Sequence, residues 1–156
     1  HGVQIALVSP PTVDTTYLFE RHDRSKYDQM PVQKLENGRN TMETLCEKKG
    51  LLFIDLFRHL QKLQIPKHEA DDIIRNRKNS GSNDGIHFTA AGNELLAQFI
   101  YSRLLTRHES PGNLRIICFG DSITHGVYMK GAGTSEGDTY PAVLEKLIVS
   151  SVQNKK

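Results

Sequence analysis

Three short and nearly continuous apolar runs constrain this chain most, because each has the length and β-branched content of a strand buried on both faces. They lie at residues 2–8 (GVQIALV), 51–54 (LLFI) and 114–119 (LRIICF). Between the first two, apolar residues recur at helical spacing from Pro31 and stop at Gly50. The order strand, helix, strand predicts a parallel βαβ unit, and the third run predicts a further strand. We therefore expect an α/β fold.

Two later segments have the apolar spacing of amphipathic helices. Thr89 is a suitable N-cap for the first, and the second begins at Tyr140. Residues 66–83 are strongly polar and predict a short surface helix followed by an exposed turn, whereas residues 14–28 show no clear period. The predicted apolar stripes are Leu95, Leu96, Phe99, Ile100 and Leu104 in the first helix, and Val143, Leu144, Leu147 and Ile148 in the second.

Length and composition limit the class of protein. A chain of 156 residues with 37% hydrophobic residues is typical of one soluble domain. A net charge of +2 lacks the basic excess of a dedicated nucleic-acid binder. No apolar run approaches the ~20 residues of a membrane span. Two cysteines cannot form a disulfide framework, so the cellular compartment stays open.

Two groups of residues are suited to chemistry. Asp84 precedes His87 in a predicted loop, where the carboxylate can accept the imidazole Nδ1 hydrogen and leave Nε2 as a general base. Ser122 follows the third apolar run, and open α/β sheets bind ligands at the carboxyl ends of strands. If His87 Nε2 reaches Ser122 Oγ, the three residues form a triad able to attack a carbonyl. Each pattern alone also suits an ordinary turn, because Gly, Asp and Ser are turn residues.

The sequence around both groups resembles one family. Residues 119–126 (FGDSITHG) are similar to the nucleophile block of the GDSL, or SGNH, hydrolases. Residues 84–93 (DGIHFTAAGN) are similar to the block that supplies the Asp and His of that family's triad. Tyr140-Pro141 before a helix, and residues 8–11 (VSPP) after a strand, also resemble segments of its small esterase branch.

The resemblance implies a role for each residue. Ser122 is the nucleophile and its backbone N–H an oxyanion donor, His87 is the base, and Asp84 orients the base. The implied activity is hydrolysis of small carboxylic esters, acyl or acetyl, through an acyl-enzyme, without a cofactor or a metal. The implied fold is a three-layer α/β/α architecture with an open, mostly parallel, flavodoxin-like sheet.

The order of the two blocks departs from the family. There the nucleophile block comes near the N-terminus and the Asp/His block near the C-terminus, whereas this chain has them reversed. The order is that of a circular permutant, a partial domain, or a junction between tandem domains. Residues 1–107 then correspond to the C-terminal half of an SGNH domain and residues 114–156 to its N-terminal half. Residues 108–113 (HESPGN) form the permutation joint or linker, which is feasible because termini of compact domains often lie close together.

Two family blocks, which supply a Gly and an Asn as further oxyanion donors, do not follow Gly126. Residues 81–84 (GSND) match the Asn block's pattern but lack a preceding strand, so we interpret Asn83 as a coincidental match. An alternative function is therefore a catalytically incomplete fragment or an interaction module. Its site would be completed by a partner, a homodimer or an exchanged domain that also completes the sheet.

Other residues have simpler interpretations. His125, close to Ser122, is a rival base, but a loop position lining the cleft is the simpler hypothesis. The remaining histidines lack metal-ligand spacing and the HExxH motif. The glycine-rich residues 131–137 are not followed by the Lys-Ser/Thr of a phosphate loop, so a nucleotide-binding domain is disfavoured. We predict instead that this segment forms a flap beside Ser122. Cys118 belongs to the third apolar run and is expected to pack rather than react.

Overall fold

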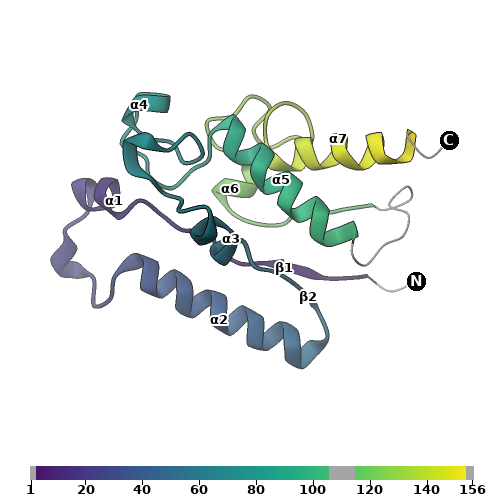
Figure 1. Cartoon of the computed structure of the whole chain (residues 1–156), viewed down its shortest axis with the longest axis horizontal. Coiled ribbons are helices and arrows are strands. Elements are labelled where there is room, and N and C mark those ends of the chain that lie inside the picture. Colours follow the sequence, from purple (N-terminus) through teal and green to yellow (C-terminus); the bar gives the residue numbers. More distant parts are fainter. Residues whose placement is uncertain (1–2, 106–114, 154–156) are drawn as a thin grey trace. The chain divides into compact units, whose positions relative to one another are not determined.

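A computed structural model describes residues 3–105 and 115–153, and it divides the chain into two compact units, residues 1–86 and residues 87–156 (Figure 1). The elements of the second unit are α5 (Ala90–Leu105), α6 (Ser122–His125) and α7 (Tyr140–Gln153). Those of the first unit are β1 (Ala6–Val8), α1 (Thr15–Arg21), the 3₁₀ turn η1 (Arg24–Lys26), α2 (Pro31–Lys49), β2 (Leu52–Ile54), α3 (Leu56–Lys62), the 3₁₀ turn η2 (His68–Ala70) and α4 (Arg77–Ser80).

The first unit is built on a parallel βαβ arrangement. β1 pairs in parallel with β2, with Ala6 opposite Leu52 and Val8 opposite Ile54, and α2 connects the two strands. The predicted βαβ unit and the α/β class are therefore confirmed. Among the described residues the sheet has two strands, so it is much smaller than the predicted open sheet.

Helix α2 begins and ends where the sequence predicts. Pro31 occupies its first turn, where the missing N–H removes no helical hydrogen bond. Gly50 ends it in the left-handed conformation at φ 64°, and its N–H bonds back to the carbonyl of Cys46. Cys46 is only 2% exposed, and burial raises the pKa of its thiol, so this cysteine packs under the helix.

The core of the first unit gathers around α1, β2 and α3. Tyr17, Phe57 and Leu60 are completely buried, and Ile54 is nearly so. Helix α1 was not predicted, although Asp14 is a clear N-cap whose side chain accepts a hydrogen bond from the Thr16 N–H at 2.9 Å. Its buried residues are Tyr17 and Leu18, which are too few to give a clear periodic signal. Helix α3 was not predicted either, because its seven residues are also too few to show a clear period.

The polar segment 66–83 folds as predicted into a short helix and a turn. Asn76 and Asn79 form a reciprocal capping box at the start of α4, and Gly81 ends the helix. The basic residues Arg77 and Lys78 occupy the single turn of α4.

In the second unit, α5 packs against α7 (Figure 1). Thr89 caps α5 as predicted, since its hydroxyl accepts a hydrogen bond from the Gly92 N–H at 3.1 Å. Asn93, which is 2% exposed, accepts a hydrogen bond from the Tyr140 N–H at 3.1 Å and so joins α5 to the first residue of α7. The predicted stripes face inward, with Leu96, Phe99, Ile100 and Leu144 buried.

The prediction of a third strand at residues 114–119 is wrong for its described part. Residues 115–119 form no strand, and Ile117 and Phe119 are 78% and 98% exposed. An apolar run becomes a strand only beside another strand that satisfies its backbone groups, and the described part of the second unit contains none.

The two compact units, residues 1–86 and 87–156, have different bounds from the halves 1–107 and 114–156, whose correspondence to the two halves of an SGNH domain stays a prediction. Because α5 packs against α7, the last helix of the first half lies in one unit with the nucleophile segment. The predicted joint at residues 108–113 lies outside the described residues.

Candidate active site

Ser122 is the first residue of the single helical turn α6. Asp121 caps this turn, since its side chain accepts a hydrogen bond from the Ile123 N–H at 2.9 Å. Gly120 is required by space, because a Cβ there would stand 2.2 Å from the Thr124 side-chain oxygen. Thr124 in turn hydrogen-bonds the Tyr140 hydroxyl at 3.1 Å. The Gly-Asp-Ser-x-Thr sequence thus has a local reason at each position, and it fixes where Ser122 stands.

The second unit brings the predicted base to the predicted nucleophile. His87 Nε2 lies 3.0 Å from Ser122 Oγ, which is hydrogen-bond distance. Both side chains are partly exposed, so water and a small substrate have access to them. A serine hydroxyl thus lies within hydrogen-bond reach of an imidazole nitrogen.

The residues that follow His87 anchor it. Phe88 is only 2% exposed, and Thr89 caps α5. A buried aromatic side chain and a helix cap therefore hold the backbone next to the imidazole, so the position of His87 depends on the packed part of the second unit.

Asp84 lies in the first unit, where it is 3% exposed. Its Oδ1 accepts a hydrogen bond from the Ile86 N–H at 2.9 Å, and its backbone carbonyl accepts one from Arg21 at 2.5 Å. Arg75 Nε stands 3.9 Å from Oδ2. Asp84 is thus a firmly held, buried carboxylate three positions before His87, and its part in orienting the base stays a prediction.

Asn83 has a different role from the oxyanion donor of the family pattern. Its side-chain amide donates to Glu20 at 2.6 Å, and its oxygen accepts from Arg77 Nε at 2.9 Å. These polar contacts within the first unit support the interpretation of the GSND match as coincidental.

The loop from Gly126 to Thr139 places one aromatic ring, that of Tyr128, against His87. The Tyr128 ring meets the His87 ring edge-on, with centroids 5.4 Å apart. His125, the rival base, lies elsewhere: a Cβ on Gly133 would stand 2.7 Å from its ring, and its carbonyl accepts the Gly133 N–H at 2.7 Å. Sequence reasoning missed Tyr128, for which the pattern carries no signal.

Two further groups near α6 have shifted proton affinities. Burial raises the pKa of Tyr140 to about 12, although its hydrogen bond with Thr124 acts in the opposite direction. Burial likewise raises the pKa of the Cys118 thiol. Both groups therefore stay protonated near neutral pH, which favours packing and hydrogen bonding over thiol chemistry at Cys118.

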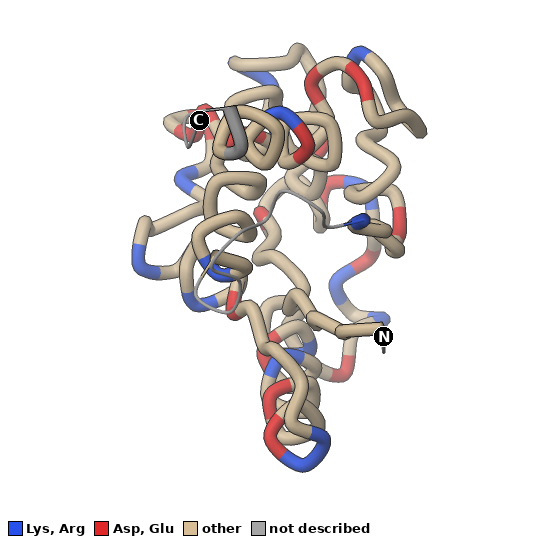
Figure 2. Tube along the Cα trace, turned by 90° about the vertical axis from the view of Figure 1, so that its right-hand side faces the viewer, with Lys and Arg blue, Asp and Glu red and all other residues tan. Residues whose placement is uncertain are grey.

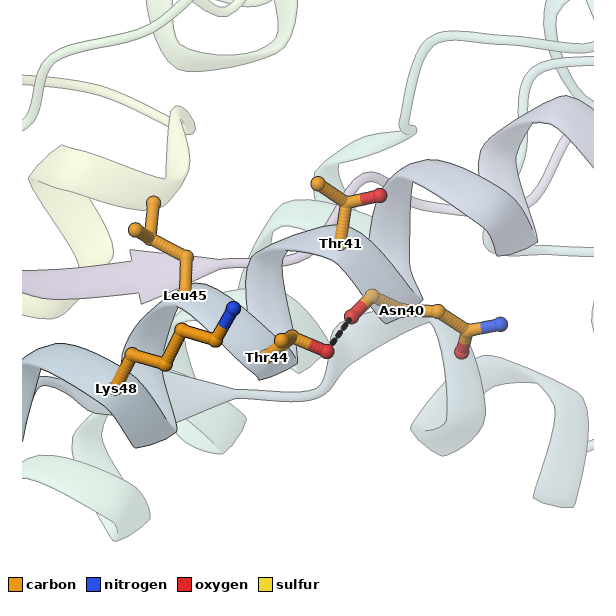
Figure 3. A pocket seen from close by; sticks show the side chains of 5 residues that line it. All are labelled: Asn40, Thr41, Thr44, Leu45 and Lys48. Atoms are coloured by element: carbon orange, nitrogen blue, oxygen red, sulfur yellow. Dashed lines mark hydrogen bonds between the residues drawn. The ribbon is translucent and has the colours of Figure 1, made fainter.

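A hollow of about 400 Å³ lies on α2, away from these residues in sequence (Figure 3). The Thr44 hydroxyl, which lines it, donates to the Asn40 carbonyl at 3.1 Å. Thr41, Leu45 and Lys48 complete the lining, and the set has no general base beside a nucleophile.

Charged residues of both signs are interspersed along the described parts of the chain (Figure 2). Within residues 3–105 and 115–153, no group of three or more His, Cys, Asp and Glu side chains is placed to hold a metal ion. None of the described helices combines the length and apolar character needed to cross a membrane.

Comparison with known proteins adds no relative. No protein-family model, curated protein or solved structure matches the chain.

Proposed function

We propose that this protein is a serine hydrolase of carboxylic esters, of the GDSL/SGNH type with its sequence blocks in permuted order. The observation that carries the proposal is the 3.0 Å distance between His87 Nε2 and Ser122 Oγ. These atoms come from two blocks that the resemblance assigns to one active site. Their proximity in the second unit is what a permuted arrangement of that site requires.

The reaction follows from this pair. His87 Nε2 removes the proton of the Ser122 hydroxyl while Oγ attacks the carbonyl carbon of the ester. The tetrahedral intermediate collapses, the bond to the alcohol oxygen breaks, and His87 gives the proton to the departing alkoxide. Water, deprotonated by His87, then hydrolyses the acyl-enzyme and restores Ser122. In the proposed reaction the Ser122 N–H donates to the oxyanion, and the Asp84 carboxylate accepts the imidazole Nδ1 hydrogen.

The test is hydrolysis of p-nitrophenyl acetate by the wild type and by Ser122→Ala and His87→Gln. Both variants should lose Ser122-dependent turnover by about 10³-fold or more, because a triad acts as a unit. Ser102→Ala is the matched control, since this exposed serine on α5 donates its hydroxyl hydrogen to the Phe99 carbonyl at 2.7 Å and should keep full activity. A fluorophosphonate probe should label Ser122 and leave Ser122→Ala unlabelled. Unchanged turnover in Ser122→Ala would refute the proposal.

The exposure of residues 115–119 favours a second candidate, an incomplete site that a second copy of the chain completes. Ile117 and Phe119 are 78% and 98% exposed, and exposed apolar side chains that lie together favour contact with another chain. Light scattering during size exclusion then gives a dimer, and specific activity rises with protein concentration. A monomer whose specific activity is independent of concentration would exclude this candidate.

A further inference from the structure

Tyr128 is placed against the candidate base by a loop rather than by a helix or strand. Its ring stands perpendicular to the His87 ring at 90°, with centroids 5.4 Å apart. Its side chain is 64% exposed, so little of the ring is needed by the core of the second unit. An exposed tyrosine whose ring packs on a catalytic histidine has a position that burial alone does not explain.

The backbone of Tyr128 adds a second, independent observation. Its φ is 69°, in the left-handed region that bulky side chains avoid and that costs free energy for any residue with a Cβ. The hydrogen bonds of the turn hold it there: Val127 N–H donates to the Ser122 carbonyl at 3.1 Å, and Met129 N–H donates to the Gly126 carbonyl at 2.9 Å. A glycine would adopt this conformation without strain. The turn thus holds Tyr128 in a strained backbone conformation that places its ring against His87. Strained residues of this kind cluster at functional sites.

We infer that Tyr128 is a positioning residue for His87, an inference that rests on the proposed esterase function. The imidazole can turn about its side-chain bonds, and only some orientations direct Nε2 at Ser122 Oγ. A perpendicular ring in contact with the imidazole restricts that rotation, and aromatic pairs favour this edge-on geometry. The contact with the imidazole is made by the aromatic ring, which Tyr128→Phe retains.

Steady-state kinetics of p-nitrophenyl acetate hydrolysis test the inference with Tyr128→Phe, Tyr128→Gly and the neighbouring control Lys130→Ala. Tyr128→Gly should lower kcat by about 10- to 100-fold with little change in KM, because the base is misplaced while the substrate still binds. Its thermal midpoint should be no lower than that of the wild type, since glycine relieves the strain. Tyr128→Phe should keep kcat within about threefold, as should Lys130→Ala. A Tyr128→Gly variant with wild-type kcat would overturn the inference.

A second measurement keeps the inference testable if the esterase proposal itself fails. The His87 ring protons in the NMR spectrum of the full chain carry a ring-current shift from Tyr128. In Tyr128→Phe the resonances should stay near their wild-type positions, whereas in Tyr128→Gly they should move and sharpen as the imidazole gains freedom. If the resonances behave in this way but hydrolysis does not depend on Ser122, the esterase proposal is refuted while the contact between Tyr128 and His87 is supported. His87 resonances that are the same in Tyr128→Gly and wild type refute the positioning contact itself.

Discussion

Replacing Gly85 with alanine is expected to destabilise the first unit mainly through crowding. Gly85 follows Asp84, and its N–H and carbonyl are both used, bonding to the Arg75 carbonyl at 2.9 Å and to the Asp14 N–H at 2.8 Å. A Cβ at this position would stand 2.9 Å from the Asp14 carbonyl oxygen and 3.1 Å from the Tyr17 Cβ. Tyr17 is completely buried and the Asp14 oxygen is backbone, so neither neighbour can move aside easily.

Gly81→Ala is a matched control that separates crowding from backbone strain. Gly81 has φ 66° and Gly85 has φ 73°, so both variants carry the same left-handed cost of about 1–2 kcal/mol. Both also gain about 0.4–1 kcal/mol because alanine restricts the unfolded chain. Nothing lies within 4 Å of a Cβ at Gly81, so crowding applies to Gly85 alone. Overpacking of this kind costs about 1–3 kcal/mol, which is the expected difference between the two variants.

Urea unfolding followed by circular dichroism measures that difference. With an m-value of about 2 kcal/mol/M, Gly85→Ala should unfold at about 0.5–1.5 M less urea than Gly81→Ala. The m-values of the two variants should agree, since the fold is unchanged. Equal midpoints for the two variants would refute the reasoning, because the shared φ cost would then account for the whole effect.

Two further predictions concern polar groups of the first unit. Ser9→Ala should lower the free energy of unfolding by about 1–3 kcal/mol, because Ser9 is 2% exposed and its hydroxyl accepts a hydrogen bond from the buried Phe57 N–H at 2.9 Å. Chemical denaturation measures this free energy, and a loss under about 0.5 kcal/mol would contradict the prediction. Burial alone would raise the pKa of Asp55, but hydrogen bonds, chiefly from Arg39, outweigh burial and hold this pKa below its usual range. The Arg39–Asp55 pair therefore stabilises the fold above pH ~4, and this stabilisation is lost as the carboxylate protonates at lower pH. Arg39→Gln should therefore be less stable than the wild type at pH 7, and the gap should narrow in unfolding curves below pH ~4, whereas a constant gap would show that Asp55 is not the group involved.

The candidate site illustrates how far residue patterns lead. Ser122 and His87 could be selected from the sequence because a Gly-Asp-Ser turn and an Asp-x-x-His loop each suit a defined chemical task. Separation along the chain does not identify His87 as the partner of Ser122, because His125 is much nearer to Ser122 in the sequence. The structure favours His87, at 3.0 Å from Ser122 Oγ, because packing of α5 against α7 brings the two segments together. Tyr128 was not predictable, since its position depends on the hydrogen bonds of one loop.

Sequence alone determined the features that depend on neighbours within a turn or two. Pro31 and Gly50 set the ends of α2, and Thr89 set the start of α5, because proline, left-handed glycine and a capping hydroxyl act on adjacent backbone groups. Only the tertiary structure decided what became of residues 115–119 and which groups surround Ser122. A strand and an active site both need partners that are distant along the chain, and their formation depends on which surfaces the whole fold brings together.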